Sequence, residues 1–327
     1  MWQTIFEEES APLMAQLEAA AAAESVVEMD ALLVQGFLGI ILRVTLGRRL
    51  DDATARKLGT GIGDVLAEVM RRSVLPAVVA NTREVATGRR CHDARASVMA
   101  TMNDNVGRRR EARAAAAAAA AAGAATAAAA AGAEGFRSKG DDEGGGGGGA
   151  TGPGDLLDLL LDADAEGAIS ASQVTAQLFT FIVAGHDTTA HTLSWLLYDV
   201  CAAPHLHDAL AAEAADALPG RLDFPTRVTL RSVPLLDRTF KEALRKHPVA
   251  ATGTFRALSA AVRLPSGERL PAGARVIVPP FAVQRNPRHW PDPERFDPGR
   301  FTPEASEGRH PHAFQAFSSG PRWGGAN

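Results

Sequence analysis

The sequence predicts a mainly α-helical fold with small β-sheets. Apolar residues recur at steps of three and four through residues 1–110, which is the spacing of amphipathic helices. Ser170 opens a second, longer helical stretch. From Val249 onward, proline and glycine become frequent and short strand-like runs appear. With 327 residues and 46% hydrophobic content, the chain can bury one large core or two modest ones.

The first part of the chain, residues 1–111, is predicted to contribute helices to that fold. Its start lacks the basic-then-apolar pattern of a targeting signal. The most hydrophobic run, Ala31–Leu42, is shorter than the roughly 20 apolar residues that span a bilayer. We therefore expect it to be a buried core helix. Membrane association is expected only through a segment that precedes residue 1, and the sequence does not indicate a localisation.

Residues 112–153 form a low-complexity stretch. It begins with an alanine tract, which is expected to extend the preceding helix because alanine is the best helix former. It ends with six glycines, Gly144–Gly149, which predict a flexible segment. We interpret the stretch as an insertion that divides one fold into residues 1–111 and residues 154–327. A linker between two separate domains is the alternative.

The part after the insertion is predicted to start with a short helix near Leu156 and to continue with a long one. Ser170 followed three positions later by Gln173 fits a capping box, in which each side chain satisfies a backbone N–H of the first turn. The long helix is expected to run to about Cys201. Further on, Arg275–Val278 is expected to form a strand after a proline–glycine turn.

The charge and the cysteine content exclude several classes of function. A formal net charge of −4 with both signs mixed predicts neither a nucleic-acid nor an anionic-membrane partner. Cys91 and Cys201 are far apart and show no metal-ligand spacing, so neither a disulfide framework nor a zinc site is expected. The two cysteines favour a reducing compartment.

The middle of the long helix carries an unusual run of small and polar residues. The hydroxyl of Thr188 is expected to bond back to the carbonyl of Ala184, which bends the helix and opens space for water or a small ligand. Asp187 beside that hydroxyl is then placed to pass protons. The alternative is a helix that packs closely on a neighbour through Gly185 and leaves Asp187 solvated.

A second charged motif lies on a later helix. Glu242 and Arg245 are three residues apart and can form an ion pair. Helical periodicity places both on the polar side, which favours a solvated pair. A functional role requires a covering layer, and the proline-rich segment Trp290–Phe301 is available for it. Arg300 in that segment is expected to join the pair as a charge-assisted lock.

Four motifs together resemble the cytochrome P450 superfamily of haem-thiolate monooxygenases, and they occur in the order seen there. They are the helix motif Ala184–Thr189, the pair Glu242 and Arg245, the segment Pro298–Phe301 and the tail Phe317–Arg322. The resemblance implies a mainly helical fold with small sheets that binds haem between the long helix and a cysteine loop. The intact family member would oxidise an apolar small molecule with dioxygen, using electrons from a reductase or a ferredoxin.

The resemblance also implies roles for single residues. Thr188 and Asp187 would protonate dioxygen, while Ala184 and Gly185 would leave room above the iron. Glu242, Arg245 and Arg300 would form the structural lock. The implied haem contacts are Arg256, Phe317, Gly320 and Arg322. For Arg256 and Arg322, ordinary surface charge is the alternative.

The sequence departs from the family pattern at the haem loop. Gly324 stands where the family has its cysteine, and glycine offers no ligand to iron. Neither existing cysteine is placed to substitute, and His310 and His312 are expected to be solvated loop residues. The family's front helices and sheet, and its final helix, are not matched. We therefore expect an incomplete fold and an inactive fragment. A haem-free helical scaffold or a pseudogene product is the alternative.

Overall fold

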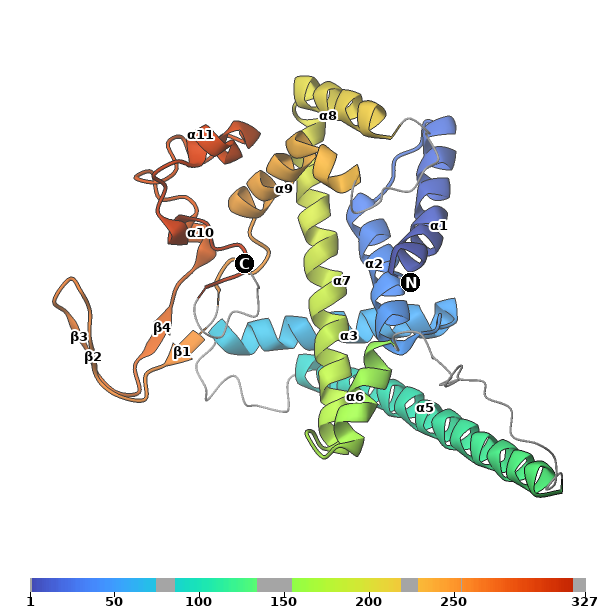
Figure 1. The fold of residues 1–327 in the computed structure, drawn as a ribbon. Coiled ribbons are helices and arrows are strands. Elements are labelled where there is room, and N and C mark those ends of the chain that lie inside the picture. The colour runs from blue at the N-terminus through green and yellow to red at the C-terminus, as the bar shows by residue number, and fades with distance from the viewer. Residues whose placement is uncertain (1, 75–85, 134–154, 219–228, 254, 320–327) are drawn as a thin grey trace, which may run out of the picture.

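The computed structural model describes residues 2–74, 86–133, 155–218, 229–253 and 255–319. It confirms the predicted mainly helical fold with small sheets (Figure 1). The helices are α1 (Trp2–Ala22), α2 (Met29–Leu46), α3 (Asp52–Val74), α5 (Ala86–Ala133), α6 (Leu156–Ala165), α7 (Ala171–Cys201), α8 (Pro204–Ala217), α9 (Pro234–Lys246), α10 (Pro280–Val283) and α11 (Pro303–Ser306). Short 3₁₀ turns are η1 (Thr229–Ser232), η2 (Pro298–Phe301) and η3 (Pro311–Ala313). The strands are β1 (Phe255–Ala257), β2 (Val262–Arg263), β3 (Arg269–Leu270) and β4 (Arg275–Ile277).

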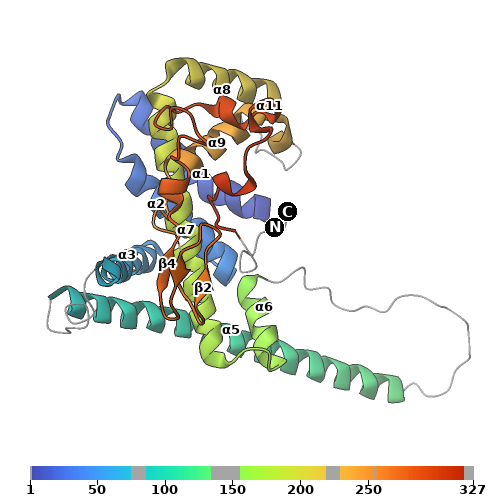
Figure 2. The ribbon, with the colours of Figure 1, turned by 90° about the vertical axis from the view of Figure 1, so that its left-hand side faces the viewer.

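The long helix α7 is the central element (Figures 1 and 2). It begins after the predicted capping box, in which the Ser170 hydroxyl accepts from the Gln173 N–H and the Gln173 side chain accepts from the Ser170 N–H. It ends at Cys201, as expected. Helix α2 packs along one side of α7, and α1 lies on α2. The C-terminal segment and the sheet of β1 and β4 lie on the other side of α7 in Figure 1.

One hydrophobic core joins the two parts of the chain that flank residues 112–153. Its buried members come from α2, α3 and α5 on one side and from α6 and α7 on the other. Leu42 and Met102, before the stretch, and Leu178 and Ile182, after it, are each no more than 1% exposed. A single continuous core of this kind is the usual content of one domain.

The apolar run near Ala31 lies in α2, and the expectation of a core helix is confirmed. A third of the 18 residues of α2 are buried, among them Leu38 and Leu42, and the helix packs against α7. Among the described residues, α2 alone is long and apolar enough to cross a membrane by length and composition. Its buried residues lie in contacts with neighbouring helices, among them α1 and α7.

The alanine tract extends the preceding helix, as predicted. Helix α5 continues to Ala133, and its residues 112–125 are exposed and project away from the other elements (Figures 1 and 2). Without larger side chains, this part of α5 has no apolar face that can dock. The glycine run Gly144–Gly149 lies outside the described residues.

Arginines of α5 pair with aspartates of α6. Arg109 is 2.6 Å from Asp155 and 2.7 Å from Asp158, and it also donates to the carbonyl of Leu46 at 2.7 Å. Its side chain is 22% exposed. Asp155 in addition caps α6, because it accepts from the Asp158 N–H. Arg109 thus ties the end of α2 to the start of α6.

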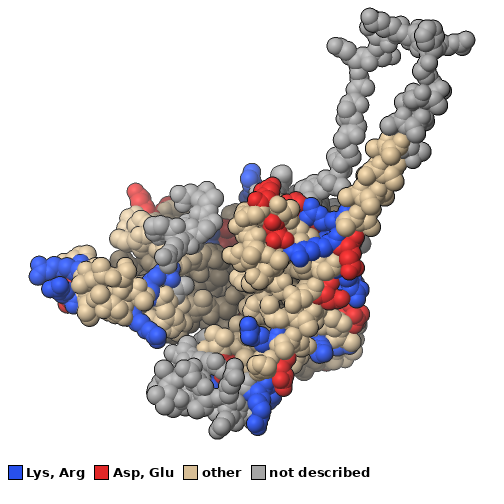
Figure 3. Space-filling model, turned by 90° about the horizontal axis from the view of Figure 1, so that it is seen from below, with Lys and Arg blue, Asp and Glu red and all other residues tan. Residues whose placement is uncertain are grey.

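The two sheets are antiparallel pairs, β1 with β4 and β2 with β3. The predicted strand at Arg275–Val278 is confirmed as β4. The hairpin of β2 and β3 projects from the molecule, and Figure 3 shows basic atoms at its tip. Exposed Arg263 and Arg269 belong to this hairpin.

A second small core holds α9 against α7 and α8. Beside it, the buried Asp199 carboxylate accepts from Lys246 and contacts His247, both at 2.8 Å. The His247 ring stacks on Trp195 with centroids 4.3 Å apart. Burial alone would raise the pKa of the Asp199 carboxyl, but the hydrogen bonds from His247 and Lys246 outweigh it and hold that pKa below its ordinary value.

Replacing Arg109 by alanine should lower the free energy of unfolding by about 1–3 kcal/mol, because two carboxylates and a carbonyl lose their partner. Urea denaturation followed by circular dichroism measures the change. The control is Arg113→Ala, which removes the more exposed pair with Asp162 and should have little effect. If the free energy of unfolding falls equally in the two variants, Arg109 does not stabilise the fold more than the exposed Arg113 does.

The lowered pKa of Asp199 makes the stability depend on pH in the acid range. A carboxyl whose pKa is lower in the folded state stabilises that state above its unfolded pKa, and this contribution is lost as pH falls through the folded pKa. The unfolded reference value is 3.8. The decrease in stability below about pH 4 should therefore be smaller in Asp199→Asn than in the unsubstituted chain. Asp208→Asn, which changes an exposed side chain of α8, is the control and should leave the dependence of stability on pH unchanged.

Candidate functional site

The predicted bond within α7 is present. The Thr188 hydroxyl donates to the Ala184 carbonyl at 2.6 Å, and the Thr192 hydroxyl donates to the Thr188 carbonyl at 2.7 Å. Thr188 and Ala184 are both exposed. One surface of the helix therefore presents a hydroxyl that is held in a fixed direction.

This surface of α7 also carries large apolar side chains. Phe181 is 43% exposed and Trp195 is 44% exposed. Together with Ala184 and Thr188 they follow a spacing of three, four and seven residues, which places them on one side of a helix. We call these four residues the open face of α7. A large exposed apolar surface beside a fixed polar group is typical of a binding site.

Gly185 does not belong to the open face. A Cβ atom at this position would lie 2.5 Å from Cδ1 of Ile41, on α2. The glycine therefore allows α2 and α7 to approach each other closely. The expectation that Gly185 leaves room for a ligand is wrong, because Ile41 fills that space. The alternative of close helix packing describes this residue.

The carboxylate of Asp187 lies beside His191 rather than free in solvent. Oδ1 of Asp187 is 3.7 Å from Nδ1 of His191, and the Asp187 side chain is 34% exposed. Nε2 of His191 is in turn 3.6 Å from Asp30, in the first turn of α2. Sequence reasoning missed His191, although its position four residues after Asp187 on one helix is a signal for contact.

Glu242 and Arg245 of α9 are both 0% exposed. Arg245 donates from Nε and Nη2 to the two carboxylate oxygens at 2.7 and 2.8 Å. The expectation of a solvated pair is wrong, because the segment Gln284–Arg300 covers the polar side of α9. That segment supplies the carbonyl of Gln284 to Arg245 at 3.0 Å and the N–H of Asp297 to Glu242 at 2.9 Å.

The structure brings Arg300 to the same carboxylate. Its Nε is 3.4 Å from Oε1 of Glu242, and its terminal nitrogens donate to the carbonyls of Pro291 and Asp292 at 2.6 Å each. We call Glu242, Arg245 and Arg300 the charged lock. It joins α9 to a proline-rich segment that has few backbone hydrogen bonds of its own.

Two fully buried side chains, Gln284 and Trp290, extend this contact toward the C-terminal end. Gln284 donates to the carbonyls of Leu244 and Arg245 and accepts from the N–H of Gln315 at 2.8 Å. Trp290 donates to the Ala313 carbonyl at 3.2 Å. Sequence reasoning did not identify Gln284, because nothing local marks a glutamine as buried. These hydrogen bonds hold Ala313 and Gln315, and so fix the segment that leads to Phe317.

Arg309 packs on this region with its guanidinium 4.3 Å from the Trp290 ring centroid. Burial, together with the positive charge of Arg300, lowers the pKa of the Arg309 guanidinium below its ordinary value. Its Nη2 donates to the Arg300 carbonyl. Arg309 therefore holds the far side of the segment that carries the lock.

Arg256 and Phe317 lie in one pocket of about 450 Å³, which is also lined by Gly253 and Val278. Gly253 has φ +66°, and a Cβ atom there would be 2.5 Å from the Val278 carbonyl oxygen, so glycine is required. The Arg256 guanidinium donates to the neighbouring Phe255 carbonyl and contacts no carboxylate of a described residue. The pocket is therefore suited to an anionic group. The other expected contacts, Gly320 and Arg322, lie outside the described residues.

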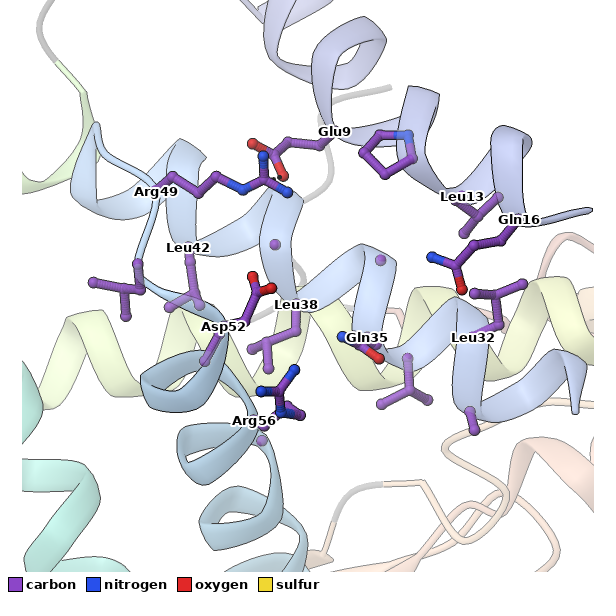
Figure 4. A pocket seen from close by; sticks show the side chains of 18 of the residues that line it. Glu9, Leu13, Gln16, Leu32, Gln35, Leu38, Leu42, Arg49, Asp52 and Arg56 are labelled. Atoms are coloured by element: carbon purple, nitrogen blue, oxygen red, sulfur yellow. Dashed lines mark ion pairs between the residues drawn. The ribbon is translucent and has the colours of Figure 1, made fainter.

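Another pocket of about 450 Å³ lies between α1, α2 and α3 (Figure 4). Its walls include Leu13, Leu38 and Leu42, and Glu9 and Arg49 lie side by side at one end. None of the predicted site residues lines it. It is separate from the open face of α7.

The described residues contain no group of three or more metal-ligating side chains. Cys201 is exposed at the end of α7, and Cys91 is partly buried in α5. His310 and His312 are exposed, as expected for solvated loop residues. Gly324, which the sequence motif predicts at the position of the family's cysteine, lies outside the described residues.

Comparison with known proteins identifies the family. The family model described as Cytochrome P450 matches residues 1–323. Human cytochrome P450 4F12 is 40% identical over 173 residues, which are 51% of this chain and 32% of that protein. Probable cytochrome P450 6a13 of Drosophila melanogaster is 34% identical over 172 residues, which are 51% of this chain and 35% of that protein. Leukotriene-B4 omega-hydroxylase 3 of the mouse is 38% identical over 173 residues, with shares of 51% and 32%.

Solved structures show the same fold. The haem domain of cytochrome P450DA has a TM-score of 0.71 at 21% identity, covering 98% of this chain and 61% of that one. A zebrafish cytochrome P450 solved with progesterone has a TM-score of 0.72 at 20% identity, covering 98% and 65%. The matched part thus spans about a third of the curated relatives and under two thirds of these structures.

The described residues have the fold of solved cytochrome P450 structures. The motifs of α7 and α9 stand in one chain with that helical fold. The match over nearly the full length is decisive for the family. The chain belongs to the cytochrome P450 family.

Haem is the cofactor that the family implies, and the described residues fit it in part. The Arg256 guanidinium, which lines a pocket and pairs with no carboxylate of a described residue, suits a haem propionate. The open face of α7 offers an apolar surface with a single fixed hydroxyl. Gly324, at the position where the sequence motif predicts the iron ligand, offers none.

Replacing Glu242 by glutamine should destabilise the fold by about 3–5 kcal/mol, because the buried Arg245 and the partly buried Arg300 lose their counter-charge while the side-chain shape is kept. Chemical denaturation measures the loss. Asp237→Asn is a matched control on the same helix, since it removes an exposed pair with Lys241 and should change stability little. A loss below about 1 kcal/mol in Glu242→Gln would contradict the burial of the lock.

Proposed function

We propose that the protein represented by this chain is a monooxygenase that oxidises an apolar small molecule with dioxygen. The observation that carries the proposal is the open face of α7, where the Thr188 hydroxyl is bonded to the Ala184 carbonyl at 2.6 Å beside exposed Phe181. A directed hydroxyl in an apolar surrounding is suited to orient a water or an oxygen ligand. Membership of the cytochrome P450 family supports this reaction class.

The haem, when bound, supplies the activation of dioxygen. Ala184 and Thr188 would border the space in which oxygen and substrate lie. Asp187, with its partly exposed carboxylate, would take protons from solvent and deliver them next to the Thr188 hydroxyl. Arg256 would pair with a propionate, with Phe317 beside it. Gly320 and Arg322 are proposed as further haem contacts from the family motif alone.

The charged lock is proposed to act indirectly. It contacts neither the open face nor the Arg256 pocket. Its bonds to the segment Gln284–Arg300, and those of Gln284 to Gln315, support the chain that reaches Phe317. Loss of the lock would therefore displace the haem contacts of that chain.

The substrate class and the partners rest on the family and on the apolar character of the open face. One relative is named for hydroxylation of leukotriene B4, which is consistent with a mainly apolar substrate here. Electrons would come from a separate reductase or ferredoxin. We propose no nucleic-acid partner, since the net charge is −4 with both signs mixed.

We further propose that this chain, with its present sequence, is inactive. Gly324 provides no thiolate, and a thiolate ligand donates the electron density that favours cleavage of the O–O bond. Cys201 is at the end of α7, thirteen positions beyond Thr188, and Cys91 belongs to α5. A helix rises about 1.5 Å per residue, so Cys201 lies roughly 20 Å along α7 from that hydroxyl.

The test is reconstitution with haem followed by carbon-monoxide difference spectroscopy. The unsubstituted chain should lack the red-shifted band of a thiolate ligand, and Gly324→Cys should produce it. Gly325→Cys is the matched control and should not produce it, because the thiol is displaced by one position. A thiolate band in the unsubstituted chain would refute the proposed inactivity.

The same experiment distinguishes the monooxygenase proposal from the alternative of a haem-free scaffold. Each variant is first shown to be folded by circular dichroism. If folded Gly324→Cys takes up no haem, the monooxygenase proposal is wrong for this chain and the scaffold remains. If it takes up haem with a thiolate band, the proposal is supported.

A further inference from the structure

His191 of α7 lies between two carboxylates from different helices. Its Nδ1 is 2.7 Å from the backbone carbonyl oxygen of Asp187 and 3.7 Å from Oδ1 of the same residue. Its Nε2 is 3.6 Å from Oδ2 of Asp30, on α2. The three side chains are 34–45% exposed, so water reaches each of them.

The hydrogen bonds define the tautomer of the ring. A backbone carbonyl oxygen only accepts, so Nδ1 of His191 carries a hydrogen that it donates to Asp187. In the neutral ring, Nε2 is then left with a lone pair that faces Asp30. Asp30 is itself oriented, because its Oδ1 accepts from the Ser194 hydroxyl at 2.7 Å.

We propose that His191 is a positioning residue that holds Asp187 beside Thr188 and exchanges protons between Asp187 and the solvent at the start of α2. This inference rests on the proposed function, in which Asp187 delivers protons to the open face. It adds a residue outside the motif Ala184–Thr189 and a second element, α2, to the path of the proton.

The proposed proton transfer is balanced when water supplies the proton. A proton from water binds Nε2 of His191, and the charged ring then gives its Nδ1 proton to the carboxylate of Asp187. One proton enters and one leaves, and the ring is neutral again with its proton on Nε2. Exchange with water restores the starting tautomer. The 3.7 Å between Nδ1 and Oδ1 is closed by a small rotation of the carboxylate or bridged by one water.

The charges around His191 favour this role. Among the described residues, the ionic groups that face the ring are Asp187 on its own helix and Asp30 on α2, and both are acidic. The Ser194 hydroxyl also bonds to this set, through Asp30.

The test needs no haem and uses the full chain. The carboxyl carbon of Asp187 and the ring nitrogens of His191 are followed by NMR as pH is raised. We expect the Nδ1–H tautomer in the neutral ring, and an inflection of the Asp187 signal at the pH where His191 titrates.

His191→Gln should abolish that inflection while the amide still donates to the Asp187 carbonyl. His207→Gln, which changes a histidine paired with Asp208 on α8, is the matched control and should leave the Asp187 signal unchanged. The inference is overturned if the Asp187 titration is the same in His191→Gln and in the unsubstituted chain. A failure to bind haem would refute only the proposed function, because the titration is independent of haem.

Discussion

Two opposite charges, on Glu242 and Arg245, are completely removed from water, and the C-terminal half of the chain is arranged around them. Burying a charge is costly unless every polar atom finds a partner. Helix α9 cannot provide those partners alone. They come from the Gln284 carbonyl, the Asp297 N–H and the Arg300 guanidinium. The lock therefore forms only when the proline-rich segment is in one position, which makes it a constraint on conformation more than a source of stability.

That constraint reaches the candidate site through Gln284. Its amide is bonded to α9 on one side and to the N–H of Gln315 on the other. Residues 315–319 line the same pocket as Arg256. The chain that carries Phe317 is thus held by a network whose centre is a different helix, whereas Arg256 lies on β1 and is positioned by its pairing with β4. The proposed effect of the lock on a haem contact would pass through that chain.

The sequence predicted what depends on local chemistry. The capping box located the start of α7, the alanine tract extended α5, and the proline–glycine turn preceded β4. The sequence-based prediction failed where contacts with residues far away in the sequence determine whether a side chain is buried. Periodicity gave α9 a solvated side, because periodicity cannot show that residues some 50 positions later cover it. For Gly185 both alternatives were open, and only the position of Ile41 on α2 decides between them.

The close approach of α2 and α7 also explains why one side of α7 is free. Gly185 lets Ile41 pack tightly, and Leu178 and Ile182 complete the core on that side. A helix that is so well held on one side can leave residues such as Phe181 and Thr188 of its other side exposed. Polar side chains of α7 lie outside its tightly packed contact with α2. Thr188 lies on the open face, whereas Asp187 and His191 lie where α2 begins and Asp30 faces them. The same packing that gives the helix its rigidity therefore places an acid, a histidine and a hydroxyl within a few residues of one another, at the boundary between the core and solvent.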